Sequence, residues 1–167
     1  KFFEYFDVDG AKDIREVFTK VVGHAEQRKV EDFEANELLN DLSNVKYLLY
    51  SPAAGPISQK YDADKKHFAV DIVLEENAPV MAVAHGTVIF AEWTAETGHV
   101  IIVKHDYGLL SVYKHNSYLE KSQGDLVKAG EVIAKAGNTG EFSTGWHLHF
   151  ELWINGYSAD PTDFIEF

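Results

Sequence analysis

The apolar residues of this chain follow two different periods, and the change between them falls near residue 50. Between residues 11 and 42 they recur at helical spacing with charged residues between them, which predicts two amphipathic helices. The apolar positions are Ile14, Val17, Phe18, Val21 and Val22 in the first, and Val30, Phe33, Leu38, Leu39 and Leu42 in the second. The helical period ends before the stretch 51–56, which contains two prolines and a glycine.

Beyond residue 56, short β-rich runs alternate with turn residues. The expected strands are 57–61, 68–74, 79–84, 87–91, 99–105, 109–115, 126–128, 132–136 and 147–154. Such a series predicts a mainly β domain over residues 51–167, an antiparallel barrel or sandwich, with residues 1–50 as a helical N-terminal segment. Asp160 followed by Pro161 predicts a capped single helical turn over 160–164.

Two segments of the β domain show a weak internal similarity. Residues 79–88 and 126–134 each contain a short strand, a glycine turn and a second strand. They resemble the halves of hybrid-motif barrels, a group that includes biotinyl and lipoyl carrier domains. A carrier displays a modifiable lysine at a hairpin tip, and no such hairpin stands out in this sequence. The carrier interpretation is therefore the weaker one.

Composition narrows the classes of function. A formal net charge of −12 argues against nucleic acid as a partner and against charge-driven binding to an anionic membrane. The absence of cysteine leaves histidine, aspartate and glutamate as metal ligands. No apolar run of about 18 residues occurs. Because Lys1 is not an initiator methionine and no signal pattern follows it, we expect a piece of a longer precursor, with membrane contact only through an anchor outside this sequence.

The clearest candidate chemistry lies in the last expected strand, where two histidines stand two residues apart. Alternation along a strand places His147, His149 and Glu151 on one face. Leu148, Phe150 and Leu152 then point the other way, into a core. Two imidazoles on one face lie only about 6–7 Å apart along the strand, which is close enough to share a metal site. The alternative is a pair of surface histidines.

Three further groups of candidate residues lie upstream of this pair. His67 and Asp71 would be about 13 Å apart in a straight strand, so a shared metal requires a bend that leaves His67 in a loop; otherwise they are a loop histidine and a surface aspartate. The next group is the run 111–115, in which alternation predicts that Ser111, Tyr113 and His115 share a face. The last is His105, at the end of the run 101–105, which either faces the site or satisfies a loop; we favour the structural role. The remaining histidines, His24, His85 and His99, are interpreted as surface or packing residues.

Taken together, the order of these motifs resembles the lysostaphin/LytM family of zinc endopeptidases from about Ser51 to the C-terminus. The matching segments are His67-x-x-x-Asp71, Gly98–Gly108, Tyr113-x-His115 and Gly137–Glu151. The resemblance implies a largely antiparallel β-fold and cleavage of peptide bonds in bacterial peptidoglycan, in the extracytoplasmic cell envelope. It also implies that His67, Asp71 and His149 are zinc ligands, and that His115 and His147 are catalytic histidines that do not bind the metal.

The general chemistry of zinc peptidases agrees with these implied ligands and catalytic histidines. Three protein ligands leave a fourth position open, as in catalytic zinc sites, and zinc lowers the pKa of bound water. No His-Glu-x-x-His helix supplies a glutamate base, so a histidine must carry the proton. Glu151 would either orient a ligand or face solvent. Two alternatives stay open: a catalytically silent LytM-like binding or activator module, and an intact enzyme that residues 1–50 inhibit.

Overall fold

The computed structural model describes residues 49–140 and 145–167. The two predicted helices and the proposed boundary before Ser51 cannot be compared with it, because residues 1–48 lie outside these ranges. Within them, the chain is mainly β and contains no helix long and apolar enough to cross a membrane. The prediction of a mainly β, antiparallel domain is confirmed.

Each predicted run contains a strand. The strands are β1 (Ile57–Gln59), β2 (Val70–Val73), β3 (Pro79–Met81), β4 (Gly86–Thr94), β5 (Gly98–Lys104), β6 (Leu109–Leu119), β7 (Leu126–Val127), β8 (Val132–Ala136), β9 (His147–Ile154) and β10 (Tyr157–Ala159). The last of these was not predicted, nor was the short 3₁₀ helix η2 (Asp106–Gly108). The predicted capped turn is confirmed as η3 (Pro161–Asp163), where the Asp160 side chain accepts a hydrogen bond from the Thr162 N–H.

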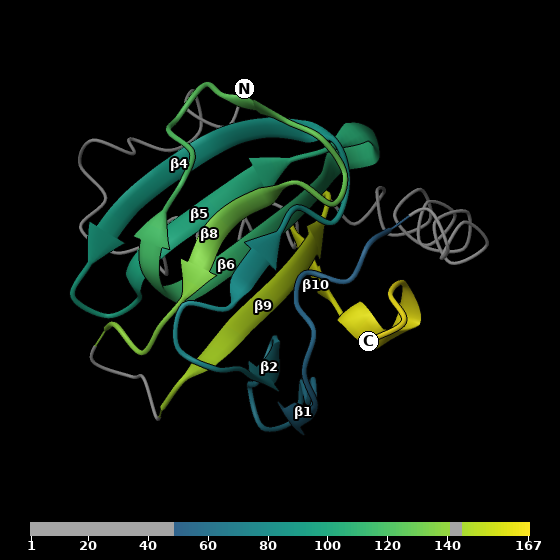
Figure 1. The fold of residues 1–167 in the computed structure, drawn as a ribbon. Coiled ribbons are helices and arrows are strands. Elements are labelled where there is room, and N and C mark those ends of the chain that lie inside the picture. Colours follow the sequence, from purple (N-terminus) through teal and green to yellow (C-terminus); the bar gives the residue numbers. More distant parts are fainter. Residues whose placement is uncertain (1–48, 141–144) are drawn as a thin grey trace.

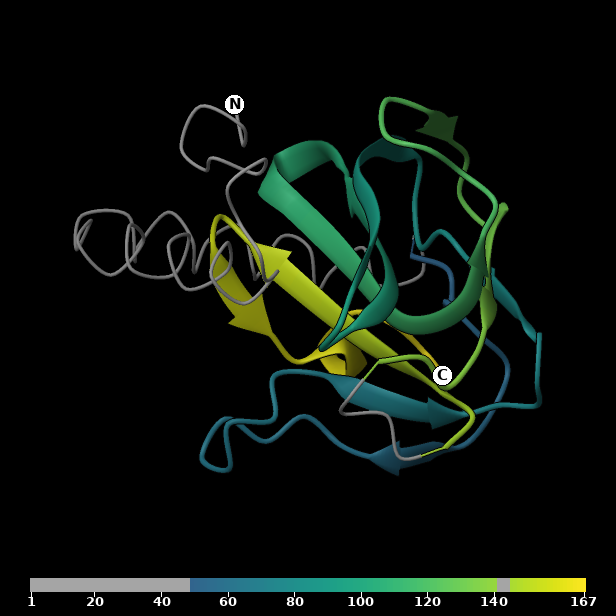
Figure 2. The ribbon, with the colours of Figure 1, turned by 90° about the vertical axis from the view of Figure 1, so that its left-hand side faces the viewer.

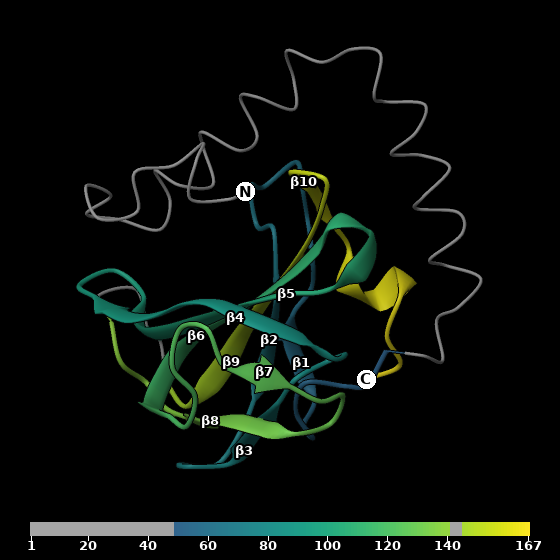
Figure 3. The same cartoon turned by 90° about the horizontal axis from the view of Figure 1, so that it is seen from above.

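The strands form an open antiparallel sheet in the order β1-β2-β9-β6-β5-β4-β7 (Figure 1). Strand β10 pairs with the end of β9, and β8 joins β6 to β3. In Figure 2, β1 and β2 lie together at one edge of the sheet. Figure 3 shows β3 and β8 side by side, on one side of the main sheet.

The two internally similar segments pair with each other. Strand β3 of the first segment pairs with β8 of the second, and β4 of the first pairs with β7 of the second. The similarity in sequence thus corresponds to two strand–turn–strand units that interlock.

The main core lies against one face of the sheet. Strand β9 contributes Leu148, Phe150 and Leu152 to it, all fully buried. The intervening residues of β9 face the other side of the sheet, where Trp153 packs in a second, smaller apolar cluster with residues of β4, β5 and β6. The alternation predicted for β9 is therefore confirmed, and it places His149 and Glu151 opposite the main core.

Strand β6 bends at His115, and this bend helps to form the candidate site. Residues 109–114 pair with β9, whereas residues 116–119 pair with β8. His115, between them, has φ 66°, in the left-handed region that residues other than glycine rarely adopt. Tyr113 stays in the main core, whereas the His115 ring contacts His147 and His149. The prediction that Ser111, Tyr113 and His115 share one face is wrong, because the bend interrupts the alternation.

Candidate functional site

The three candidate metal ligands come from two paired strands and one loop. Asp71 of β2 is directly opposite His149 of β9 in the register of the sheet. His67 precedes β2 and is folded back by a turn in which Lys66 has φ 56° and Asp62 bridges to His67. The bend that shared ligation requires is therefore present, and one ligand atom from each of the three residues lies within 4.8 Å of the others.

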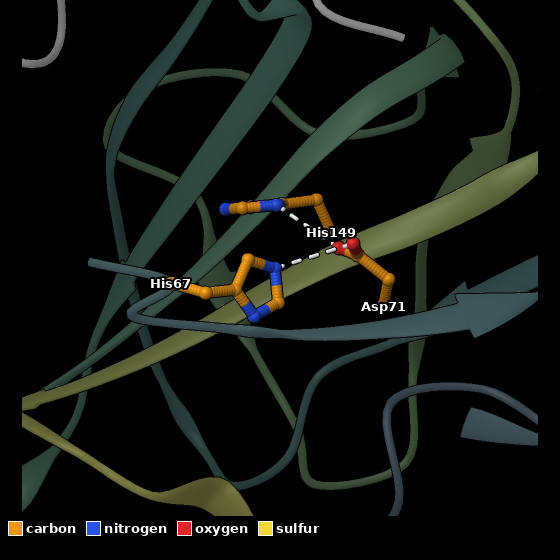
Figure 4. Close-up of side chains that lie close together, drawn as sticks. All are labelled: His67, Asp71 and His149. Carbon is orange, nitrogen blue, oxygen red and sulfur yellow. Dashed lines mark hydrogen bonds and ion pairs between the residues drawn. The ribbon is translucent and has the colours of Figure 1, made fainter. Parts of the chain in front are cut away.

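The three side chains converge on the Asp71 carboxylate (Figure 4). His67 Nε2 lies 3.2 Å from Asp71 Oδ2, and His149 Nδ1 lies 3.0 Å from Oδ1. Oδ1 is buried, yet it has no aligned hydrogen-bond donor in the described part of the chain. A buried carboxylate oxygen without a donor is costly. A cation that accepts lone pairs from both rings and the carboxylate would satisfy it.

The charges around His149 also favour a cation. Burial alone lowers the pKa of His149, but contacts with Asp71 and Glu151 raise it above its ordinary value. For Asp71, burial raises the pKa, and the surrounding histidines, His149 foremost, lower it by more. An ionised carboxylate and two imidazoles form the nitrogen and oxygen donor set that zinc uses in catalytic sites. The residues present therefore fit such an ion.

Glu151 does not face solvent, which was one of its two predicted positions. Its side chain is buried and contacts Nε2 of His149 through Oε2, at 3.1 Å. Lys114 Nζ lies 2.7 Å from the same oxygen, and the Trp153 indole N–H donates to Oε1 at 3.1 Å. Sequence reasoning missed Lys114 and Trp153. In the sequence, Lys114 stands out only as a charged residue within a largely apolar strand, and this does not reveal that its partner is Glu151.

His115 and His147 flank the ligand cluster. Their ring centroids are 5.3 Å apart, and His115 is 5.8 Å from His149. The Nδ1 atom of His115 donates to the Thr139 carbonyl and that of His147 to the Gly145 carbonyl, both at 2.8 Å. Because a carbonyl only accepts, each ring carries its proton on Nδ1. Within the described ranges no group hydrogen-bonds to Nε2 of either ring.

The environment of His115 favours its neutral form. Burial is the main cause, and it lowers the pKa of His115 to about 4 with help from the nearby His149, His147 and Lys114. The hydrogen bond to Thr139 opposes this shift without cancelling it. At neutral pH His115 therefore presents an Nε2 lone pair that can accept a proton.

Thr139 holds the loop that orients His115. Its hydroxyl donates to the Asn116 carbonyl and accepts from the His99 N–H, so it ties the loop to both β6 and β5. Gly98 allows this approach, since a side chain there would collide with Thr139, and its φ of 63° also favours glycine. The sequence motif contains both residues but does not reveal this contact. Residues 141–144 of the motif lie outside the described ranges.

The other described histidines lie apart from the site, as predicted. His105 is buried: its Nδ1 donates to the His85 carbonyl at 2.8 Å, and its Nε2 is hydrogen-bonded to the Ser111 hydroxyl at 2.7 Å. His85 is exposed and pairs with Asp106. His99 has its backbone in contact with Thr139 but is not among the ligand cluster.

Comparison with known proteins identifies the family to which this chain is similar. The model of peptidase family M23 matches residues 65–161. The DD-carboxypeptidase/endopeptidase Mpg of Neisseria meningitidis serogroup B is 32% identical over 122 residues, which are 71% of this chain and 28% of that protein. The chain thus spans less than a third of the length of this curated relative.

Two solved structures are similar to the described fold. A zinc containing peptidase from Vibrio cholerae has a TM-score of 0.63 at 28% identity, covering 68% of this chain and 37% of that one. The catalytic domain of lysostaphin from Staphylococcus simulans has a TM-score of 0.57 at 31% identity, covering 68% of this chain and 89% of that domain. The resemblance to lysostaphin is confirmed, and the chain belongs to peptidase family M23.

Proposed function

We propose that this protein is a zinc-dependent endopeptidase that hydrolyses peptide bonds of bacterial peptidoglycan, in stem or cross-link peptides. The observation that carries the proposal is the cluster of His67, Asp71 and His149, in which the buried Asp71 Oδ1 has no aligned donor among residues 49–140 and 145–167. Two further histidines lie beside it, and no residue in the described part of the chain is bonded to their Nε2 atoms. Such a combination of ligands and neighbouring bases is typical of hydrolytic metal sites.

His67, Asp71 and His149 would hold the ion. When bound, zinc supplies Lewis acidity that polarises a carbonyl and makes water more acidic. The Asp71 carboxylate balances part of the ionic charge, and Glu151 fixes the far side of the His149 ring. The β2–β9 pairing sets the spacing of two of the three ligands, so the sheet itself preorganises the site.

His115 and His147 would handle protons. Each ring has its Nδ1–H engaged by a backbone carbonyl, which leaves Nε2 to accept a proton from water. Once protonated, the same atom can donate to the oxyanion that forms on the attacked carbonyl. Two rings 5.3 Å apart can divide these tasks between them. The bend of β6 and the loop containing Thr139 hold His115 in place for this role.

The substrate class follows from the lysostaphin/LytM resemblance and from the names of the relatives, which are peptidases. Peptidoglycan lies outside the cytoplasmic membrane, so the proposed location is the periplasm or cell surface. The strongly acidic chain is consistent with a peptide rather than a nucleic acid as partner.

Metal analysis and digestion of purified peptidoglycan test the proposal together. We expect about one zinc per chain and new peptide termini in the digest, detected by mass spectrometry. A chelator should abolish cleavage, and added zinc should restore it. Zinc binding without any cleavage, combined with cosedimentation with peptidoglycan, would favour the silent binding module instead.

A further inference from the structure

We infer that Glu151, secured by Lys114 and Trp153, is a positioning residue that fixes the tautomer and orientation of His149 toward the metal. The inference rests on the proposed function, because it assigns His149 as a ligand. It concerns Glu151, which contacts the His149 ring at Nε2, the nitrogen away from Asp71, and the two side chains that hold Glu151.

The two nitrogens of His149 face two different carboxylates. Nδ1 lies 3.0 Å from Asp71 Oδ1, and Nε2 lies 3.1 Å from Glu151 Oε2. The Nε2 contact has hydrogen-bond geometry, whereas Asp71 Oδ1 has no aligned donor among the described residues, so Nδ1 is not placed to donate to it. Because an ionised carboxylate only accepts hydrogen bonds, the Glu151 contact places the ring proton on Nε2. The neutral ring then has its lone pair on Nδ1, on the side where Asp71 and His67 converge. The hydrogen bond to Glu151 thus selects the tautomer that ligation requires.

Glu151 can do this because it is itself held firmly. Its side chain is 6% exposed and that of Lys114 is 12% exposed, so their 2.7 Å contact is largely shielded from water. Trp153 donates to Oε1, which prevents the carboxylate from rotating away from His149. Three donors on one buried carboxylate satisfy both of its oxygens.

The register of the sheet places these groups together. Lys114 of β6 is directly opposite His149 of β9, while His149, Glu151 and Trp153 alternate along one face of β9. A buried ammonium directly opposite a metal ligand would repel the ion. Its contact with Glu151 offsets this charge, which explains how a lysine can occupy this position.

Zinc affinity of the purified chain, measured by competition with a chromophoric chelator, tests the inference. Glu151→Gln keeps the size of the side chain but weakens its acceptor, and we expect the zinc dissociation constant to rise about 10–100-fold. The visible spectrum of the cobalt-substituted protein should also change, since it reports ligand geometry. Glu131→Gln is the matched control, because it disrupts the more exposed ion pair with Lys121 and should leave both readouts unchanged.

Two more variants separate positioning from simple charge repulsion. Lys114→Met should keep zinc affinity close to wild type, because His149 still has its carboxylate partner. The double variant Lys114→Met/Glu151→Gln removes the buried charge pair as a unit and should fold, since replacing both partners avoids an unpaired charge. Its zinc affinity should stay weakened.

Recovery of wild-type affinity in the double variant would show that unpaired Lys114 caused the loss, and would overturn the positioning role. Wild-type affinity and spectrum in Glu151→Gln would overturn it as well, while leaving the proposed zinc site intact. Failure of the wild-type chain to bind zinc would instead overturn the proposed function together with this inference.

Discussion

Strand β6 contributes to two polar clusters that differ in whether protein groups satisfy their polar atoms. The closed cluster consists of His105, Ser111 and Tyr113. Both ring nitrogens of His105 are hydrogen-bonded, and the Tyr113 hydroxyl contacts Ser111 at 2.9 Å and accepts from the Val83 N–H at 3.1 Å. All three side chains are buried, and burial raises the pKa of Tyr113.

The open cluster consists of His67, Asp71 and His149, with His115 and His147 beside them. Here the buried Asp71 Oδ1 has no donor, and within the described ranges nothing is bonded to Nε2 of His115 or His147. Histidine thus has opposite consequences in the two clusters. A satisfied network stabilises the fold, whereas an unsatisfied one leaves polar atoms available to a ligand.

The largest expected effect is the loss of metal from the open cluster. Asp71→Ala and His149→Ala each remove one of the three proposed ligands, so we expect both zinc and peptidoglycan cleavage to disappear. Elemental analysis of each variant decides this. Asp106→Ala, which alters an exposed carboxylate, should keep full zinc. Full zinc occupancy in a ligand variant would remove that residue from the set.

The next largest effect separates chemistry from ligation. His115→Ala and His147→Ala should retain zinc but lose about 10²–10⁴-fold in turnover, which is the usual contribution of a general acid–base group. Zinc content measured beside the cleavage rate distinguishes them from His149→Ala. His85→Ala is the control, because that side chain is exposed, pairs with Asp106 and is not part of the His67–Asp71–His149 cluster. Wild-type turnover in both variants would contradict the proposed mechanism.

Disruption of the closed cluster should cost stability and leave the metal site intact. Tyr113→Phe removes the acceptor for the buried Val83 N–H and should lower the free energy of unfolding by about 1–3 kcal/mol. Urea unfolding of the chain measures the change, and the zinc content should stay at the wild-type level. Tyr118→Phe makes the same chemical change at an exposed position, where we expect an effect within about 0.5 kcal/mol. Equal effects at both sites would show that the network does not stabilise the fold.

A smaller effect concerns pH. Burial lowers the pKa of His105, and the hydrogen bond to the His85 carbonyl only partly opposes it. As the pH falls below about 6.5, the unfolded state therefore takes up a proton before the folded state does. His105 thus contributes to a loss of stability on acidification that is absent at higher pH. Urea unfolding of the chelator-treated protein across this range should show a shallower decline for His105→Gln; an identical slope would contradict it.

The smallest expected effect is that of removing residues 1–45. We propose that residues 1–50 and 51–167 are separate units. The β domain is contacted just before its proposed start, because Leu49 packs against the core and the Tyr50 N–H donates to the Val83 carbonyl. A chain that begins at Lys46 should therefore keep one cooperative thermal transition. Loss of that transition would place the N-terminal residues in the core. A higher cleavage rate would instead support inhibition by this segment.

Much of the fold could be predicted because strand patterns are local. The alternation in β9 separates Leu148 and Phe150 from His149 and Glu151 without reference to any other strand. The turn residues divided the chain close to the observed strand ends. Strand β10 was missed because it is stabilised by its pairing with β9, which no local pattern reveals.

The sequence by itself determined which chemistry is available: histidines and carboxylates at fixed spacing, no thiolates, and a motif order shared with a family of peptidases. The tertiary structure decided which of these groups meet. The turn at Lys66 brings His67 to Asp71, the bend at His115 moves that ring to the other face of β6, and the β6–β9 register sets Lys114 opposite His149. The bend and the register depend on pairing between segments far apart in sequence, whereas the turn is local and depends on a single left-handed residue. A local hydrophobic period carries no information about either.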